Sequence, residues 1–283
     1  MSDYQYYEFR TIDRRLDEKQ LRELRRFSRR ARITPTSFQI HYDWSDFRGD
    51  PKAMVEKYFD AFVYLASGGS RRLEFRFPKK LVDLKALKRY DTGGAVRLWT
   101  TRLHAILSFR HKFEQDEDAE GEGWLDSLVE LRAALMAGDR RAAYLGWLMG
   151  VSLDDVSPES EEPPVPSGLD ELTPALEGFV KFFRIDADLV AAAGSRSGAR
   201  EEAAPTAREL AAFIKAIPAA EKDALLLRAI KGDVPHLRAE LLLSFEDSKP
   251  APGKTARKKP EPRTAAELLA AADRRAGTRS ARA

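Results

Sequence analysis

Hydrophobic and polar residues follow two periods in the first third of the chain, one typical of strands and one typical of helices. Residues 4–12 (YQYYEFRTI) are rich in aromatic side chains, and residues 34–44 alternate between apolar and polar side chains, so both stretches predict strands. Between them, residues 17–31 repeat apolar side chains at helical spacing. Asp17 is the predicted N-cap of this helix, and Gln20 stands three residues on, as in a capping box.

A second helix is predicted after Asp50 and Pro51, because a capping residue is followed there by a proline at the first helical position. Its broad apolar stripe continues through Ala66, and Gly68 and Gly69 end it. Beyond it the pattern predicts a strand at 71–78 (RRLEFRFP), a short helix near 81–90 and a hairpin over 93–113 that turns at Thr100 and Thr101.

The second half of the chain has only helical periodicity. Helices are expected over 124–138, 139–151, 169–183, 186–193, 206–217, 219–231 and 234–245. The predicted fold class is therefore α+β. An N-terminal α+β domain (1–113, a mixed sheet with helices) precedes an acidic linker (114–123), an all-helical domain (124–247, with an internal linker at 152–168) and a disordered basic tail (248–283), in which a short helix could form at 263–276.

Composition narrows the classes of protein that the chain could represent. The chain has 283 residues, of which 43% are hydrophobic and 33% charged, as in an ordinary soluble protein with a charge-rich surface. The absence of cysteine excludes disulfides, thiolate nucleophiles and cysteine-ligated zinc or iron–sulfur sites. No stretch approaches 18 consecutive apolar residues, and the first residues lack a signal-peptide pattern, so we expect no membrane span and a cytoplasmic location.

Positive charge is unevenly distributed along the chain. The net charge is +3, yet residues 249–283 hold ten Lys or Arg and three acidic residues, so they carry about +7 and the remainder about −4. A partner with negative charge, either nucleic acid or an acidic protein, would therefore meet the tail.

A second concentration of positive charge lies on the predicted helix 17–31. Its arginines fall largely off the apolar stripe, where guanidinium groups could bind phosphates. The alternative is a solvated helix face whose last cations suit the negative end of the helix dipole. The candidate anion-binding residues are Arg22, Arg25, Arg26, Arg29 and Arg30 of this helix, together with Lys258 and Lys259 of the tail.

The loop near residues 41–50 contains the only grouping that suggests metal or acid–base chemistry. His41, Asp43, Asp46 and Asp50 are suitable ligands for a metal ion, but Asp50 is better explained as a helix cap and Asp46 as a turn residue. The four histidines stand in no nucleophile or zinc-protease motif, and no glycine-rich phosphate loop is present. We therefore predict no catalytic residue, no metal and no cofactor.

The segments YQYYEFRTIDRRL, RARITPTSF, YDWSDFRGDP and KYFDAFVYLA resemble those of an uncharacterised family of bacterial proteins. The resemblance covers residues 4–90 strongly, and the helical half and the segment RTAAELLAAA more loosely. Since that family has no assigned activity, the resemblance implies no catalytic residue. It implies a bacterial, cytoplasmic setting.

The sequence favours a non-enzymatic interaction or regulatory protein that contacts nucleic acid or another anionic partner through its basic tail and arginine-rich helix. One alternative is an enzyme with an unfamiliar site near residues 41–50. Another is a helical scaffold subunit of a larger complex, in which exposed apolar side chains around Tyr144, Trp147 and Leu148 would form the interface.

Overall fold

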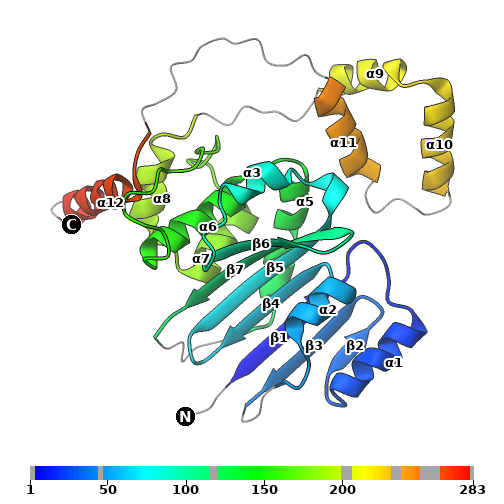
Figure 1. Ribbon diagram of the computed structural model, residues 1–283, viewed down its shortest axis with the longest axis horizontal. Coiled ribbons are helices and arrows are strands. Elements are labelled where there is room, and N and C mark those ends of the chain that lie inside the picture. The colour runs from blue at the N-terminus through cyan, green and yellow to red at the C-terminus, as the bar shows by residue number, and fades with distance from the viewer. Residues whose placement is uncertain are drawn as a thin grey trace.

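A seven-stranded antiparallel sheet with helices on both faces forms the body of the protein in the computed structural model (Figure 1). The structure describes residues 4–43, 47–114, 120–198, 206–230, 237–248 and 262–280. The predicted fold class, an α+β region followed by helices, is confirmed. The strands are β1 Gln5–Arg10, β2 Arg32–Thr34, β3 Ser37–Tyr42, β4 Ala61–Ala66, β5 Ser70–Pro78, β6 Val96–Thr100 and β7 His104–Lys112.

The strand order is β2-β3-β1-β4-β5-β7-β6, and every pairing is antiparallel rather than mixed as the sequence predicts. Short connections join β2 to β3, β4 to β5 and β6 to β7, and such hairpins can only pair strands in opposite directions. The predicted hairpin over 93–113 is confirmed as β6 and β7. The single strand predicted at 34–44 is instead the second arm of the hairpin β2–β3.

The helical elements account for most of the remaining described chain. They are α1 Glu18–Phe27, α2 Pro51–Lys57, the 3₁₀ helix η1 Lys79–Leu81, α3 Leu84–Lys88, α4 Trp124–Leu128, α5 Glu130–Met136, α6 Arg141–Ser152, α7 Pro174–Phe183, α8 Ala187–Gly194, α9 Ala207–Ala216, α10 Ala219–Ile230, α11 Leu237–Ser248 and α12 Ala265–Ser280. None of the described helices is long and apolar enough to span a bilayer.

Helices α1 and α2 cover one face of the sheet. The capping box of α1 is confirmed, because Asp17 accepts from the Gln20 amide at 2.8 Å and Gln20 accepts from the Asp17 amide at 3.0 Å. Leu24 of α1 and Met54 of α2 then pack with the side chains of β1, β3 and β4 that point to this face, Phe9 among them. Figure 1 shows α2 lying across the strands.

The long helix predicted from Pro51 to Ala66 is wrong. The helix ends at Lys57, and residues Ala61–Ala66 form β4, which pairs with β1 on one side and β5 on the other. A central strand that is buried on both faces reads as a continuous apolar run, and such a run has the same appearance as a buried helix. Asp60 lies between the helix and the strand, and its carboxylate is buried against Arg76 at 2.7 Å.

Helices α4 to α8 cover the opposite face and share one hydrophobic core with it. Helix α6 lies so close to the sheet that a Cβ at Gly146 would stand 2.6 Å from Phe109. The expectation of exposed apolar side chains on this helix is therefore wrong. Tyr144, Trp147 and Leu148 are 0%, 4% and 0% exposed.

The end of the described chain returns to this helical layer. The short helix allowed for at 263–276 is present as α12, and it packs against α8 instead of remaining apart from the body (Figure 1). Leu268 on its inner face is fully buried, and Arg263 just before it pairs with Glu162 at 2.6 Å. Apolar residues at helical spacing and a buried ion pair explain why α12 packs on the body although the sequence predicts a disordered tail. The other residues of the predicted tail, apart from Ser248 and Pro262, lie outside the described residues.

Helices α9 to α11 form a smaller group beside the body. Among the described residues, no side chain of α9 or α10 is buried, and Glu240 of α11 connects the group to Lys80 at 2.7 Å. Large apolar side chains are exposed on this group at Ile214, Leu226, Leu227 and Ile230.

Candidate anion-binding face of the sheet

The sheet face that carries α1 and α2 continues beyond α2 onto strands β5, β7 and β6, where most of its side chains are polar. The pairing register places Arg72 of β5 opposite Arg110 of β7, and Arg97 of β6 opposite Ser108 of β7. Paired residues point to the same face of a sheet. These three arginines, which we call the arginine triad, therefore project from neighbouring strands on one face.

One buried carboxylate lies beneath the arginine triad. Glu74 is fully buried, and its Oε1 accepts a hydrogen bond from Arg72 Nε at 2.6 Å. Arg110 Nη2 lies 3.8 Å from the same oxygen, and Arg110 Nε donates to Ser108 at 3.2 Å. Among the described residues, neither Glu74 Oε2 nor Arg72 Nη2 has a hydrogen-bond partner, although that nitrogen lies 2.5 Å from Oε1. Arg72 Nη2 is buried, so the donors that a ligand can reach lie on the more exposed side chains of Arg110 and Arg97.

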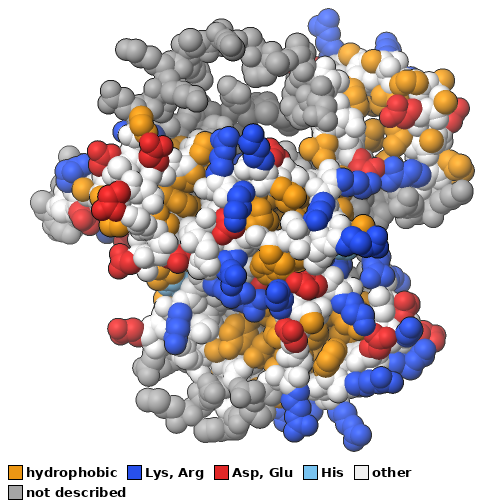
Figure 2. Space-filling model, in the orientation of Figure 1, with side chains coloured by type: hydrophobic (Ala, Val, Ile, Leu, Met, Phe, Trp, Pro, Cys, Tyr) orange, Lys and Arg blue, Asp and Glu red, His pale blue; other side chains and the backbone are white. Residues whose placement is uncertain are grey.

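Exposure increases across the triad from β5 to the edge strand β6. The side chain of Arg72 is 19% exposed and that of Arg110 is 38% exposed, whereas Arg97 is an exposed residue. Figure 2 shows Lys and Arg side chains gathered over strands β5, β6 and β7, beside hydrophobic side chains. A ligand in solution can therefore reach the outer guanidinium groups.

The electrostatics of the triad favour an anion. Burial lowers the pKa of Arg110, and the neighbouring charges of Arg72 and Arg97 lower it further, while Glu74 raises it. Arg72 and Arg110 thus share Glu74, the only carboxylate that contacts them in the described part of the chain, and Arg97 lies close enough to Arg110 to lower its pKa. A bound oxyanion would relieve this repulsion and accept charge-assisted hydrogen bonds.

Aromatic side chains border the triad on the side of α2. The guanidinium of Arg72 lies over the ring of Phe62, 5.5 Å from its centroid. Trp99, two residues beyond Arg97 on β6, donates from its indole nitrogen to Glu56 of α2 at 2.8 Å. The ammonium of Lys52 lies 5.6 Å from the centroid of the Trp99 ring. These contacts fix α2 beside the triad.

The chemistry of the triad supports binding rather than bond-making. Guanidinium groups stay protonated and donate hydrogen bonds, so they cannot serve as general bases. Ser108 is buried and holds Arg110. Within the described ranges, no group of three or more His, Cys, Asp or Glu side chains is placed to hold a metal ion.

The arginines predicted on helix 17–31 have separate roles in the structure. Arg22 pairs with Glu18 at 3.4 Å, and Arg25 donates to the carbonyls of Arg29 and Ala31, which secures the chain after α1. Arg30 lies over the ring of Tyr42 at 5.3 Å. Arg26 and Arg29 are exposed, as is Arg22. Lys258 and Lys259 lie outside the described residues.

The loop near residues 41–50 does not form a site in the part that the structure describes. His41 and Asp43 are exposed. Asp50 accepts from the Lys52 amide at 2.9 Å and so caps α2, as its position before Pro51 predicts. Asp46 lies outside the described residues.

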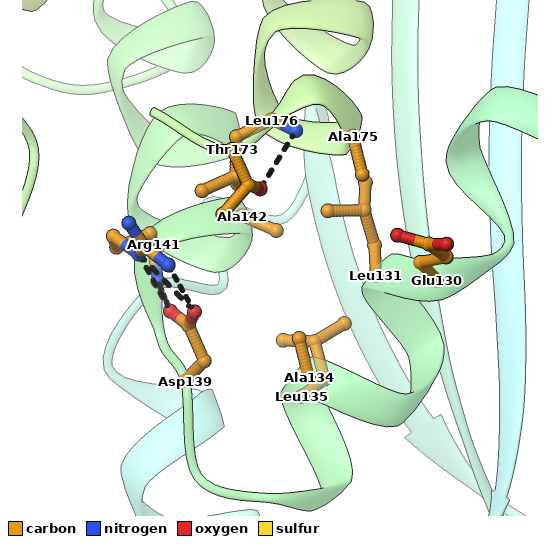
Figure 3. Close-up of a pocket in the computed structure, with 10 residues that line it drawn as sticks. All are labelled: Glu130, Leu131, Ala134, Leu135, Asp139, Arg141, Ala142, Thr173, Ala175 and Leu176. Atoms are coloured by element: carbon orange, nitrogen blue, oxygen red, sulfur yellow. Dashed lines mark hydrogen bonds and ion pairs between the residues drawn. The ribbon is translucent and has the colours of Figure 1, made fainter. Parts of the chain in front are cut away.

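A cavity of about 150 Å³ lies between α5, α6 and α7 (Figure 3). Leucine and alanine side chains form much of its wall. The guanidinium of Arg141 at its rim is engaged by Asp139 at 2.8 Å and by the carbonyls of Gly168 and Glu171 at 3.0 Å each. Those bonds hold the connection before α7 in place, so this arginine serves the fold and not a ligand.

The arginine triad is not predicted by the pattern of the sequence. Alternation in RRLEFRFP places Arg72 and Glu74 on one face, but Arg97 and Arg110 join them only through the strand order β5-β7-β6. No protein-family model, no curated protein and no solved structure matches the chain. The resemblance of residues 4–90 to a bacterial family is not tested by these comparisons.

Proposed function

We propose that the protein is a non-enzymatic binding protein that captures an anionic partner on the open face of its sheet. The observation that carries this proposal is the arginine triad around the single carboxylate of Glu74, with exposure that increases toward Arg97. The arginines of α1 and the lysines of the tail are additional candidate contacts. A cytoplasmic location remains a prediction from the sequence.

Arginine is well suited to such a role because its planar group donates two parallel hydrogen bonds to an oxyanion. In this site Arg72 is held by Glu74, and Arg110 by Ser108, so part of the ordering cost is met before a ligand arrives. An enzyme near residues 41–50 is less well supported, because His41 and Asp43 are exposed and Asp50 caps α2.

The test is calorimetric titration of the full chain with inorganic tripolyphosphate. The triad variant carries Arg72→Gln, Arg97→Gln and Arg110→Gln. A control variant removes the same charge at exposed arginines elsewhere, namely Arg89→Gln, Arg102→Gln and Arg208→Gln.

We expect the triad variant to bind at least about tenfold more weakly than the control, since each charge-assisted hydrogen bond contributes about 1.5–3 kcal/mol. The single variant Arg97→Gln, at an exposed position, guards against a folding defect and should show a smaller loss. Equal affinity of the triad and control variants, or no binding by the unaltered protein, contradicts the proposal.

A further inference from the structure

The arginine triad does not stand alone on its side of the molecule. Helices α1 and α2 pack on the same sheet face, since Leu24, Met54 and Phe62 belong to one hydrophobic cluster and Arg72 lies over Phe62. The outward side chains of both helices therefore face the same solvent as the triad.

Direct contacts connect the triad to α1 through α2. Trp99 follows Arg97 on β6, and Lys52 of α2 lies over the Trp99 ring. At the other end of α2, Lys57 pairs with Glu23 of α1 at 2.9 Å. The path from β6 to α1 is thus continuous in contacts between side chains.

Cations are exposed at every stage of this path. Lys52 and Lys57 of α2 are 57% and 62% exposed at their side chains. Arg22 and Arg26 lie one turn apart on α1, opposite the buried Leu24, and Arg29 follows the helix; all three are exposed. The acidic residues along the path are engaged, because Glu56 pairs with Lys52 and accepts from Trp99. On α1, Glu23 pairs with Lys57 and Glu18 with Arg22. We call this surface the basic track: Arg72, Arg97, Arg110, Lys52, Lys57, Arg22, Arg26 and Arg29.

The length of the basic track indicates which kind of anionic ligand could contact all of it. The sheet has seven strands, and neighbouring strands lie about 4.8 Å apart, so the track extends over roughly 29 Å. A mononucleotide or a free phosphate would occupy only one part of it. A nucleic-acid strand carries a phosphate at every nucleotide and could meet cations along the whole path.

We propose that the anionic partner is a single-stranded nucleic acid that lies along the basic track from the arginine triad to α1, an inference that rests on the proposed function. A flexible strand can follow the step from the open sheet onto α2, whereas a duplex is stiff over this length. Trp99 and Tyr64 are partly exposed along this path, which suits the apolar surface of unstacked bases.

The test measures binding of fluorescently labelled oligo(dT) of about 4, 8 and 16 nucleotides by anisotropy over a range of salt concentrations. The variants are the triad variant, an α1 variant (Arg22→Gln, Arg26→Gln, Arg29→Gln) and the charge-matched control at Arg89, Arg102 and Arg208. Urea unfolding of each variant confirms that it is folded before binding is compared.

For the unaltered protein and the longest oligonucleotide, the slope of log K against log salt should be about −5.6, because about eight phosphates are neutralised and each contributes about −0.7. The triad variant and the α1 variant should each reduce the magnitude of that slope by about 2. The shortest oligonucleotide should be insensitive to the α1 variant.

Distinct results separate this inference from the proposed function. If the α1 variant matches the control at every length while the triad variant loses binding, the anion site stands and the basic track is wrong. If the triad variant matches the control, both are wrong. A duplex that binds more tightly than the single strand at equal length overturns the single-strand assignment. Displacement of oligo(dT) by poly-glutamate of equal charge overturns it as well.

Discussion

Replacing Glu74 with Gln should strengthen anion binding, which is the reverse of the usual result for a buried residue in a binding site. The substitution keeps the shape of the side chain and removes the only carboxylate that contacts the arginine triad among the described residues. Glu74 competes with a ligand for Arg72 and Arg110, and its charge repels an incoming anion. Its removal leaves the guanidinium groups of Arg72 and Arg110 without a compensating charge.

The magnitude follows from the distances in the site. Glu74 lies 2.5 Å from Arg72 Nη2 and 3.8 Å from Arg110 Nη2, so an anion on the outer nitrogens would stand roughly 6.5 Å from the carboxylate. At that distance and an effective dielectric constant of about 20, the repulsion is about 2.5 kcal/mol. Screening at physiological salt reduces it to about 1 kcal/mol, so affinity should rise about fivefold there and more at low salt.

Tripolyphosphate titration at two salt concentrations measures this gain, with Glu177→Gln on the exposed surface of α7 as the control. Urea unfolding should show a loss of about 1–3 kcal/mol in Glu74→Gln, because the hydrogen bond from Arg72 loses the negative charge of its acceptor. A folded Glu74→Gln protein that binds as the control does, or more weakly, refutes the reasoning. Glu74 would then serve to position Arg72 and not to oppose the ligand.

Three predictions concern stability. Gly146→Ala should destabilise the protein by about 1–3 kcal/mol in urea unfolding, because the new methyl group would clash with Phe109 of the sheet. The control Gly178→Ala should be neutral or stabilising by up to about 1 kcal/mol, because its new methyl group would lie 3.6 Å from the nearest atom, Ser127 Oγ. Leu268→Ala should cost about 2–5 kcal/mol, and no loss would mean that α12 is not part of the core. Burial and two nearby arginines lower the pKa of His111 to about 4. The unfolded state therefore binds its proton more readily, stability should fall as pH drops from about 6.5 toward 4, and His111→Gln should reduce that fall in melting temperature.

Elements with a strong local pattern could be predicted from the sequence. The cap at Asp17 and the alternation in 71–78 are local signals, and they correspond to α1 and β5. Strand β4 could not be separated from the preceding helix, because both of its faces are buried and its apolar run has no strand period. The packing of α12 on α8 depends on partners about 80 residues away, which no local pattern contains.

The candidate site was harder to predict than the fold for a related reason. Arginine density along the chain directs attention to residues 22–30, in α1 and just after it, where five arginines fall within nine residues. The triad has one arginine on each of three strands, and only the pairing of β5 with β7 and of β7 with β6 brings them together. The order of strands in a sheet is difficult to predict from a single sequence.

Counting charge by segment also misjudges which arginines are available to a partner. Arg263 belongs to the most basic segment, yet it is buried with Glu162, and Arg76 and Arg132 are likewise enclosed with Asp60 and Asp13. Such a pair presents almost no net charge to the solvent, and removing one member would leave a buried charge uncompensated. The arginine triad differs because its cations outnumber the carboxylate that they share. The ratio of cations to carboxylates at one place in the fold, and not the net charge of a segment, therefore determines where an anion can bind.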